Sequence, residues 1–436
     1  MLEREVSSIV NLCKTYLFLQ GPHGPFMSML GDRLAAAGHR VLRINFNGGD
    51  KIDWQRGGAE NFCGTAEEWP AYLRWFIARQ GVTDIVFYGS WRPVHHAAIG
   101  IARDMGVMLH GFEEGLLRPH WVTLSPLMPC EQAASLKDAV LSRKPYDPMP
   151  KDEREIRHDV PNYKGAHNWM LWRCFVYYAG YLLFWPLFRR YSTHRLISPT
   201  NEFAKWFWQL ACYPRFKFRS WQRLKKLNAS TGKFFLLCLQ LDGDSQIQRY
   251  SSHTGMEMVM NDVMASFATH APEDARLVIK AHPLDNNMAN LACACRRLAR
   301  RFGIWGRVDF IYFGKLAGLM KRAEGLVTVN SSTGISALYH GCPLKTLGLA
   351  AYNIDGLVDD QSLDTFWRHP KAPSGVVYDA MFDVLTTTTQ FPGGFYRYDS
   401  AQATVPAVLP VLLGRRNKRV IQKNTQPPAI TAVQQR

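Results

Sequence analysis

Short apolar runs separated by helical patterns dominate the hydropathy of this 436-residue chain. In the first part, runs at 15–20, 40–46, 84–90 and 106–112 have the length of buried strands, and FMSMLGDRLAAAGH (26–39) has helical spacing. Strands that alternate with helices are typical of βα units and a parallel sheet. We therefore predict an α/β domain in this part of the chain.

The same alternation returns from about residue 232. A second set of strand-like runs lies at 233–241, 275–283, 308–313, 325–330 and 343–348. A chain of this length can form two domains of ordinary size, each with its own core. The predicted organisation is an N-terminal α/β domain over 1–160, a connecting segment over 161–230, a C-terminal α/β domain over 231–410 and a basic flexible tail over 411–436.

The connecting segment is first apolar and then basic. Within residues 168–191, the uncharged stretch from Cys174 to Phe188 is 15 residues long and contains Pro186. Crossing a bilayer takes about 20 apolar residues, so this stretch is too short to span one. Residues 189–226 then contain ten Lys or Arg residues and a single acid. An apolar helix followed by a basic strip is typical of a surface that lies among the head groups of an anionic membrane.

Two other interpretations of this segment remain open. The apolar part can be a core helix between the domains, with the basic part as a solvated linker. Basic residues interleaved with aromatic ones also occur in nucleic-acid-binding proteins. We favour the membrane surface and expect no nucleic-acid partner. The interleaved aromatic residues are Trp206, Phe207, Trp208, Tyr213, Phe216, Phe218 and Trp221.

Composition is consistent with a folded cytoplasmic protein. Hydrophobic residues make up 47% and charged residues 20%, which argues against disorder. The net charge of +16 implies an anionic partner without identifying it. Nine cysteines, an odd number without CxxC spacing, fit reduced thiols better than a disulfide framework. The N-terminus has early acids and no small-residue cleavage site, so we predict no secretory signal.

Two acids follow the most apolar strand of the second half. The run FFLLCLQL ends at Asp242 and Asp244, and Ser245 comes next. Open parallel sheets place their chemistry just past the carboxyl ends of their strands. A carboxylate there can act as a nucleophile toward the anomeric carbon of a sugar. The alternative is that the acids only close a turn.

Two further strand ends carry groups that can bind a nucleotide. One supplies Lys280 and His282, with Pro283 keeping the chain extended. The other has small hydroxyl residues at the start of a helix predicted near Ile335, which can leave backbone N–H groups free for a phosphate. A plain N-cap is the alternative for this loop. Its residues are Asn330, Ser331, Ser332, Thr333 and Gly334.

The first half has its own candidates. Glu113 and Glu114 lie beside Arg118 and His120, and paired acids near an arginine can act as a general acid and base. On an ordinary loop, such residues would only face water. Two glycine-containing strand ends, LQGPHGPF (19–26) and NFNGGD (45–50), allow a close backbone approach. The chain has no Walker A loop, no dinucleotide fingerprint and no nucleophile elbow.

These motifs together resemble the capsule polysaccharide biosynthesis/export protein family of the KpsS/LipB type. The resemblance rests on FLQGPHGPF, RINFNGGD, DIVFYGSWRPVH, FEEGLLRPHW, LQLDGDSQI, AHP and NSSTGISAL, and runs from about residue 15 to about residue 400. It implies a GT-B-type fold, with two Rossmann-like domains facing each other across a cleft. It also implies a retaining β-Kdo glycosyltransferase that uses CMP-Kdo as its donor substrate, without a cofactor or a metal.

The family resemblance also implies a place and a partner for the reaction. The enzyme would set the first Kdo on a lysophosphatidylglycerol acceptor, at the cytoplasmic face of the inner membrane. It would be peripheral on this anionic membrane and would work beside other capsule synthesis and export proteins. The alternative is a non-catalytic adaptor that binds capsule polymer or lipid beside the export machinery.

Carried onto this chain, the resemblance assigns roles to the motif residues. Asp244 would be the nucleophile, with Asp242 as the alternative. Glu113 or Glu114 would act as acid and base toward the acceptor hydroxyl, and Gln20 and Gly21 would line the acceptor side together with Arg118 and His120. Contacts to CMP and its phosphate would come from Lys280, His282, Pro283, Asn330, Ser331, Ser332, Thr333 and Gly334.

Overall fold

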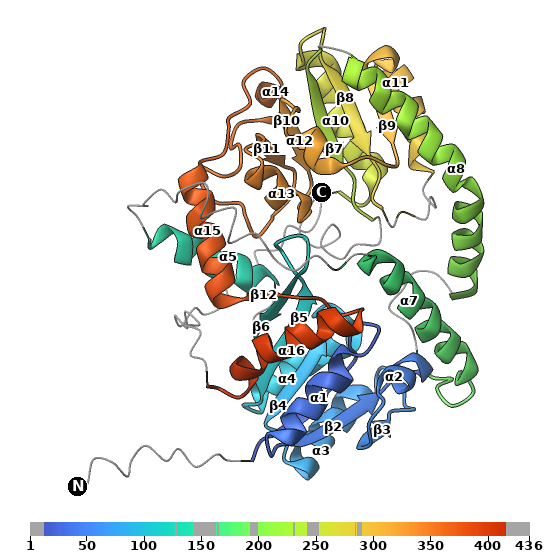
Figure 1. The fold of residues 1–436 in the computed structure, drawn as a ribbon, viewed down its shortest axis with the longest axis vertical. Helices are drawn as coiled ribbons and strands as arrows, with labels where there is room; N and C mark the ends of the chain where they lie inside the picture. Colours follow the sequence, from blue (N-terminus) through green and yellow to red (C-terminus); the bar gives the residue numbers. More distant parts are fainter. Residues whose placement is uncertain are drawn as a thin grey trace.

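Two β-sheets, one in each half of the chain, organise the protein (Figure 1). The computed structural model describes residues 13–126, 129–143, 163, 165–191, 199–229, 232–241, 253–283, 285 and 290–415. Both sheets have helices on their two faces, as expected for Rossmann-like units. The predicted two-sheet α/β architecture of the GT-B type is therefore confirmed. The predicted acids Asp242 and Asp244 lie outside the described residues.

The first sheet has seven strands in the order β12-β6-β5-β4-β1-β2-β3. Pairings among β1 to β5 are parallel, whereas β6 pairs antiparallel with β5, and β12 pairs antiparallel with β6. The four strands predicted in this half are confirmed. The strands are β1 (Thr15–Phe18), β2 (Arg40–Asn45), β3 (Ala59–Asn61), β4 (Asp84–Tyr88), β5 (Met108–Glu114), β6 (Trp121–Ser125) and β12 (Gln390–Pro392).

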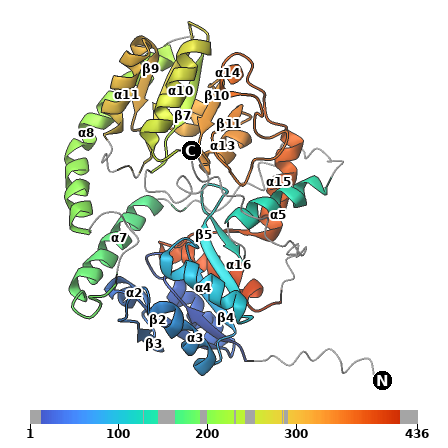
Figure 2. The ribbon, with the colours of Figure 1, turned by 180° about the vertical axis from the view of Figure 1, so that it is seen from behind.

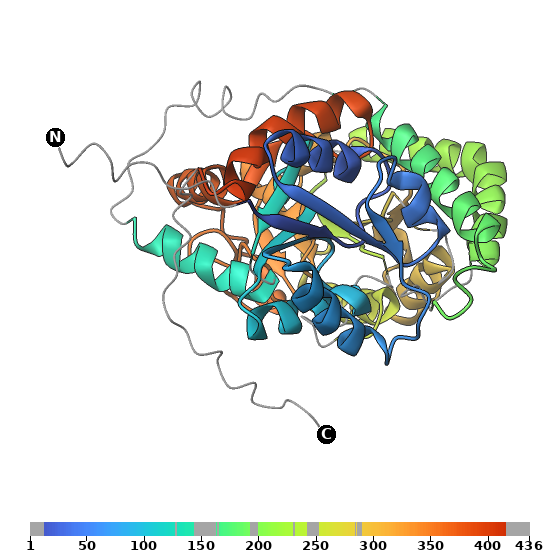
Figure 3. The same cartoon turned by 90° about the horizontal axis from the view of Figure 1, so that it is seen from below.

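Alternation along the strands divides the core of this unit between two faces. In β1, Tyr16 and Phe18 pack on the side of α1 (Phe26–Ala36) and α16 (Tyr398–Leu412), while Leu17 packs on the side of α3 (Trp69–Gln80) and α4 (Pro93–Asp104). Figure 3 shows the dark-blue α1 and the red α16 together on one side of the blue strands. Successive side chains of a strand point to opposite faces, so burial on both faces gives a continuous apolar run.

The second sheet has five strands in the order β11-β10-β7-β8-β9, all parallel. Its central strand β7 is buried along its whole length. All five strands predicted in this half are confirmed. They are β7 (Phe234–Cys238), β8 (Arg276–Lys280), β9 (Val308–Ile311), β10 (Gly325–Thr328) and β11 (Leu344–Thr346).

Helices cover both faces of the second sheet as well. Phe235 and Leu237 of β7 pack among the helices α10 and α11, whereas Phe234 and Leu236 pack toward α13 and α15. Cys293 and Cys295 lie on the 11-residue helix α11. The helices of this half are α10 (Met256–His270), α11 (Leu291–Arg301), α12 (Leu316–Met320), α13 (Thr333–Tyr339), α14 (Leu363–Phe366) and α15 (Gly375–Thr388), with a 3-10 turn, η1, at Trp305–Arg307.

The end of the chain returns to the first sheet. After α15, strand β12 joins β6 at the edge of the first sheet, and α16 packs beside α1. The hydroxyl group of Tyr16 donates a 2.7 Å hydrogen bond to the carbonyl of Leu412 at the end of α16. Residues 390–410, which were predicted to belong to the C-terminal domain, therefore pack on the N-terminal sheet, together with residues 411–412 from the predicted tail.

One apolar cluster joins the two units. Leu136 and Val140 of α5 (Pro129–Leu141) lie in the same buried cluster as Leu236 of β7 and Met381 of α15. Figures 1 and 2 show α5 and α15 side by side between the two sheets. Burial of apolar area is the largest favourable term in folding, so this shared cluster holds the two sheets in one arrangement.

The connecting segment divides between the two units. Helix α7 (Ala166–Leu183) packs on α2 (Gly48–Asp53) of the first unit, and α8 (Pro199–Ala229) packs on β9 of the second. Figure 2 shows both helices along one flank of the molecule. Helix α7 ends before Pro186, and among the described helices none combines the length and the apolarity that spanning a membrane requires.

Two glycines of the NFNGGD motif are required for the contact between α2 and α7. A Cβ on Gly48 would lie 2.1 Å from the carbonyl oxygen of Gly180, and a Cβ on Gly49 would lie 2.5 Å from the ring of Tyr177. Such distances are well inside van der Waals contact, so any side chain there would push α7 away. The motif therefore holds the apolar helix against the first unit.

Candidate functional site

The amide groups of Gln240 and Asn330 join two strand ends in the second sheet. Gln240 Nε2 donates a 2.9 Å hydrogen bond to Asn330 Oδ1, and the backbone N–H of Asn330 donates a 3.1 Å hydrogen bond to Gln240 Oε1. From β7 the chain adds β8 and β9 on one side and then crosses to place β10 and β11 on the other, so the order of strand addition reverses between β7 and β10 while all strands stay parallel. Ligands of open α/β sheets bind outside the carboxyl ends of the strands at such a switch point. Asn330 was predicted here and Gln240 was not.

Lys280 lies at the same edge, at the end of β8. Its side chain is buried, and its ammonium group donates a 3.3 Å hydrogen bond to the carbonyl of Ala281. Burial lowers the pKa of Lys280, because a charged ammonium loses its hydration there. Within the described chain no carboxylate forms an ion pair with it. A buried cation without a carboxylate partner is suited to bind an anionic group of a ligand.

The loop before α13 offers hydroxyl groups more than backbone N–H groups. Ser331 Oγ accepts a 3.2 Å hydrogen bond from the N–H of Thr333 and donates one of 3.0 Å to Thr333 Oγ1. The N–H groups of Gly334 and Ile335 already donate to the carbonyls of Ser331 and Ser332. Helix α13 begins at Thr333, two residues before the predicted start near Ile335. The expectation of free backbone N–H groups is therefore wrong for Thr333, Gly334 and Ile335. The hydroxyl groups of the loop stay candidates for binding a phosphate.

The other predicted residues of this edge lie close by in the chain. His282 is half-buried, and its carbonyl accepts a 3.0 Å hydrogen bond from the N–H of Asp285, while Pro283 is exposed. Strand β7 ends at Cys238, four residues before Asp242. The position of the acidic pair at this edge therefore stays a prediction. No group of metal-binding side chains occurs among the residues the structure describes.

Glu113 and Glu114 do not act as a carboxylate pair. They are neighbours on β5, so their side chains leave opposite faces of the sheet. Glu113 accepts a 2.6 Å hydrogen bond from the hydroxyl of Ser90. Glu114 accepts hydrogen bonds from the hydroxyl groups of Tyr88 at 3.1 Å and Tyr396 at 2.7 Å. The two acids therefore have separate surroundings and do not form the predicted pair, while the role of either one as acid or base stays a prediction.

Arg118 and His120 lie in the turn between β5 and β6. Arg118 Nη1 is 3.4 Å from Glu114 Oε2, so the predicted proximity of an arginine to the acids is found for Glu114. His120 has a positive φ of 63°, and its ring lies 5.3 Å from that of Tyr163. Gly115 permits this turn, because a Cβ there would lie 2.3 Å from the carbonyl oxygen of Trp121.

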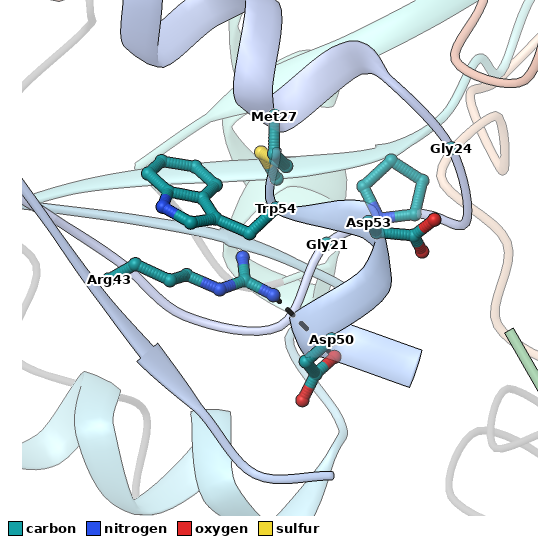
Figure 4. Close-up of a pocket in the computed structure, with 8 residues that line it drawn as sticks. Gly21, Gly24, Met27, Arg43, Asp50, Asp53 and Trp54 are labelled. Carbon is teal, nitrogen blue, oxygen red and sulfur yellow. Dashed lines mark ion pairs between the residues drawn. The ribbon is translucent and has the colours of Figure 1, made fainter. Parts of the chain in front are cut away.

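Asp50 is the centre of a buried polar network at the carboxyl edge of the first sheet. Gln20 Nε2 donates a 3.0 Å hydrogen bond to Asp50 Oδ2, and the hydroxyl of Tyr177 donates one of 3.0 Å to Asp50 Oδ1. The guanidinium of Arg43 lies 3.5 Å from Asp50 Oδ1, as Figure 4 shows. Gln20 was predicted to line the acceptor side, whereas Asp50, Arg43 and Tyr177 were missed as partners of it.

This network connects the first sheet to α7 and to the residues that follow α7. Gln20 Nε2 is also 3.2 Å from the hydroxyl of Tyr191, and Asn47 Nδ2 donates a 2.8 Å hydrogen bond to the hydroxyl of Tyr177. Tyr177 is on α7, and Tyr191 follows it. Buried polar groups are costly unless they are hydrogen-bonded, so these contacts fix the inner face of α7 on the strand ends.

A small recess lies next to the network. It is lined by Gly21, Pro22, Gly24, Met27, Arg43, Asp50, Asp53 and Trp54. Figure 4 shows the Arg43 guanidinium pointing toward Asp50, with Asp53 on the other side of the recess. Burial raises the pKa of Asp53 from 3.8 to about 8, and the nearby Asp50 carboxylate acts in the same direction. The direction of this shift favours the neutral carboxylic acid form of Asp53.

Asp53→Asn is expected to remove a pH dependence of stability. Because the carboxyl binds its proton more tightly in the folded state, wild-type stability falls as pH rises from about 4 to about 8. We expect the variant to gain on the order of 2 kcal/mol over wild type between pH 5 and pH 8, measured by urea unfolding. Asp32→Asn, at an exposed carboxylate, is the control and should show no such gain. A constant difference between variant and wild type would contradict the raised pKa.

Comparison with known proteins shows the family. Residues 83–396 match the family model described as capsule polysaccharide biosynthesis protein. The chain is 31% identical over 390 residues to the capsule polysaccharide export protein KpsS of Escherichia coli, covering 88% of this chain and 97% of that protein. It is 28% identical over 412 residues to the capsule polysaccharide modification protein LipB of Neisseria meningitidis serogroup A, covering 91% and 95%. The chain therefore belongs to the capsule polysaccharide biosynthesis protein family.

Solved structures show more distant similarity. The β-Kdo 2,7 transferase KpsC of Thermosulfurimonas dismutans aligns with a TM-score of 0.44 and 12% identity, over 92% of this chain and 99% of that one. A UDP-N-acetylglucosamine 2-epimerase described as putative, from Listeria monocytogenes, aligns with a TM-score of 0.32 and 11% identity, over 93% and 98%. Similarity at this level does not bear on the reaction.

Proposed function

We propose that this protein is a retaining β-Kdo glycosyltransferase that uses CMP-Kdo. The observation that carries the proposal is the carboxyl edge of the second sheet, where the Gln240–Asn330 pair marks the switch point and Lys280 supplies a buried cation. Nucleotides bind at such switch points, and a buried cation there can bind the anionic phosphate of a nucleotide sugar. Membership in the capsule family supports a sugar of the capsule pathway as the group transferred.

The proposed reaction has two displacements. In the first, the Asp244 carboxylate attacks the anomeric carbon of Kdo, the bond from that carbon to the phosphate oxygen breaks, and CMP leaves. In the second, the acceptor hydroxyl attacks the same carbon, Glu113 or Glu114 takes its proton, and the bond to Asp244 breaks. Two inversions give net retention at the anomeric carbon. Lys280, with the hydroxyl groups of 331–333, would stabilise the charge on the departing CMP phosphate.

The proposed acceptor is lysophosphatidylglycerol, which sets the first Kdo on a lipid. Its position would be on the side of the first sheet, near Gln20 and Gly21. A direct test combines the purified protein with CMP-Kdo and lysophosphatidylglycerol. Mass spectrometry should find a lipid product that is heavier by one Kdo residue. Binding of both compounds without a product would favour the adaptor, because an adaptor needs no chemistry.

We also propose peripheral contact with an anionic membrane through α7 and α8. Ten of the 17 large hydrophobic residues that are exposed in the described chain lie between residues 166 and 229. On α7, Trp169, Trp172 and Phe175 are spaced as one helical stripe, opposite the buried Tyr177. On α8, Phe218 and Trp221 are exposed, whereas Phe216 stacks on Tyr312 with ring centroids 4.2 Å apart. An exposed apolar patch of this extent marks an interaction surface.

Reversal of charge on α8 is expected to weaken membrane binding. Arg215, Lys217 and Arg219 are all exposed, and each basic residue near an anionic surface adds about 1 kcal/mol. Replacing all three with Glu should reduce binding to phosphatidylglycerol vesicles by about 100-fold or more in a flotation assay at low salt. The same reversal at Arg74, Arg79 and Arg103 is the matched control. Equal binding by both triple variants would show that α8 does not face the membrane.

A further inference from the structure

The first sheet has a switch point of its own. From β1 the chain builds β2 and β3 on one side, and then crosses to place β4 on the other side of β1. The segments that leave the carboxyl ends here are Gln20–Gly21 after β1 and Gly89–Arg92 after β4, and the N–H of Tyr88 donates a 3.0 Å hydrogen bond to the carbonyl of Gln20. Ligands of open α/β sheets bind outside such a point.

Arg92 lies at this switch point with its side chain folded back over the sheet edge. Its guanidinium carbon is 5.4 Å from the centre of the Tyr88 ring. Gly89 has a φ of 80°, and a Cβ there would lie 3.5 Å from Arg92 Nε, so the side chain runs close past this glycine. Arg92 is half-buried. Its guanidinium makes no hydrogen bond or ion pair with another residue of the described chain.

The positive charge of Arg92 lies near the polar groups at the carboxyl edge of the first sheet. Burial raises the pKa of Tyr191 to about 12 and also holds the pKa of Tyr177 well above its ordinary value, and the Arg92 guanidinium opposes both shifts. Its field therefore reaches the hydroxyl groups that contact Asp50 and Gln20. On the other side, Tyr88 under the guanidinium donates to Glu114. Arg92 thus stands between the acceptor-side network and the candidate acid or base.

Helix α4 adds to the positive character of this position. Arg92 is the N-cap of this 12-residue helix, and no side chain caps its N-terminus. The N-terminal end of a helix carries a partial positive charge that stabilises anions. A guanidinium has a planar fork of donors that matches the two oxygens of a carboxylate or a phosphate.

We propose that Arg92 binds an oxyanion of the substrates at the switch point of the first sheet. The inference rests on the proposed transferase function and adds a binding residue to it. The oxyanion is the phosphodiester of the lipid acceptor or the carboxylate of the sugar acid, since both present two oxygens to the fork. A role limited to stacking on Tyr88 is the competing explanation.

The test compares Arg92→Gln and Arg92→Lys with Arg79→Gln. Arg79 is a matched control, because its guanidinium also lies 5.4 Å over an aromatic ring, that of Trp75, on α3. Thermal unfolding first checks that each variant is folded. KM and kcat are then measured for CMP-Kdo and for lysophosphatidylglycerol. Ligand-observed NMR, with glycerophosphoglycerol and with free Kdo as probes, measures binding without any reaction.

Arg92→Gln is expected to raise one KM by about 10- to 100-fold, with a smaller change in kcat, because a charge-assisted hydrogen bond is lost. Arg92→Lys should fall between Gln and wild type. A rise in the KM for the lipid with loss of the glycerophosphoglycerol signal identifies the phosphate as the oxyanion. A rise in the KM for CMP-Kdo with loss of the Kdo signal identifies the carboxylate.

If Arg92→Gln behaves like Arg79→Gln in both KM values and in both NMR signals, the proposal is overturned and Arg92 only stacks on Tyr88. A wild-type protein without transferase activity would sink the proposed function, and the NMR signals would still decide on Arg92. Loss of a wild-type signal in Arg92→Gln would then support oxyanion binding. An unchanged signal, or none in the wild type, would overturn it.

Discussion

Asp244→Ala is expected to lower kcat for Kdo transfer by about 10³-fold or more, because it removes the atom that forms the covalent bond in the first displacement. The measurement is the rate of lipid product formation at saturating CMP-Kdo and acceptor. Asp242→Ala removes the same charge two residues away and is the matched control, with an expected loss of about tenfold or less.

The two acids are distinguished by which variant loses activity. If Asp242→Ala shows the large loss and Asp244→Ala the small one, the nucleophile is Asp242 and the rest of the mechanism stands. Near-normal activity in both variants would contradict double displacement through this segment.

Lys280→Met is the second large effect that we expect. Loss of the buried ammonium should weaken CMP-Kdo binding by about 10- to 100-fold, since a charged hydrogen bond to phosphate disappears. The free energy of unfolding should not fall, because the lowered pKa of Lys280 shows that burial penalises its charge. This penalty is present in full below the lowered pKa and vanishes as pH rises to the ordinary lysine value.

Calorimetric titration with CMP-Kdo and urea unfolding at pH 7 measure the two quantities. Lys233→Met, at an exposed lysine before the amino end of β7, is the control and should change neither. A variant that binds CMP-Kdo normally but unfolds more easily would assign Lys280 to structure alone.

The strands that sequence predicts well are those buried on both faces. Strand β7 has five buried residues in a row, so its apolar run is continuous and easily found. Strand β3, Ala59–Asn61, is exposed along its length, and β12 contains Pro392. Neither has an apolar run, and each forms a strand only because it pairs with the edge of a neighbouring strand.

The acidic pair shows where adjacency in sequence misleads. Glu113 and Glu114 are adjacent in the sequence, but the pleat of β5 puts their side chains on opposite faces of the sheet. Glu113 accepts a hydrogen bond from Ser90, and Glu114 accepts hydrogen bonds from Tyr88 and Tyr396. Tyr396 comes from the segment that returns to the first sheet near the end of the chain. A long-range partner of this kind leaves no local pattern, although the alternation of the strand predicts the separation itself.

Gln240 is a site residue that the sequence could have identified. It lies within the apolar run before the acids and is buried, so it requires hydrogen-bond partners. As a neutral amide, it carries no charge that would mark it as a candidate. An amide at the end of a buried strand, with an asparagine at the end of another, would have pointed to the pairing of β7 with β10.

The most direct test of the central claim is the intact mass of the protein mixed with CMP-Kdo in the absence of acceptor. The account predicts a species heavier by one Kdo residue, with the adduct located by peptide mapping to the peptide that contains Asp244, and none in Asp244→Ala. Transfer of Kdo to the lipid by a protein that never carries an adduct, even under rapid quenching, would contradict the covalent mechanism.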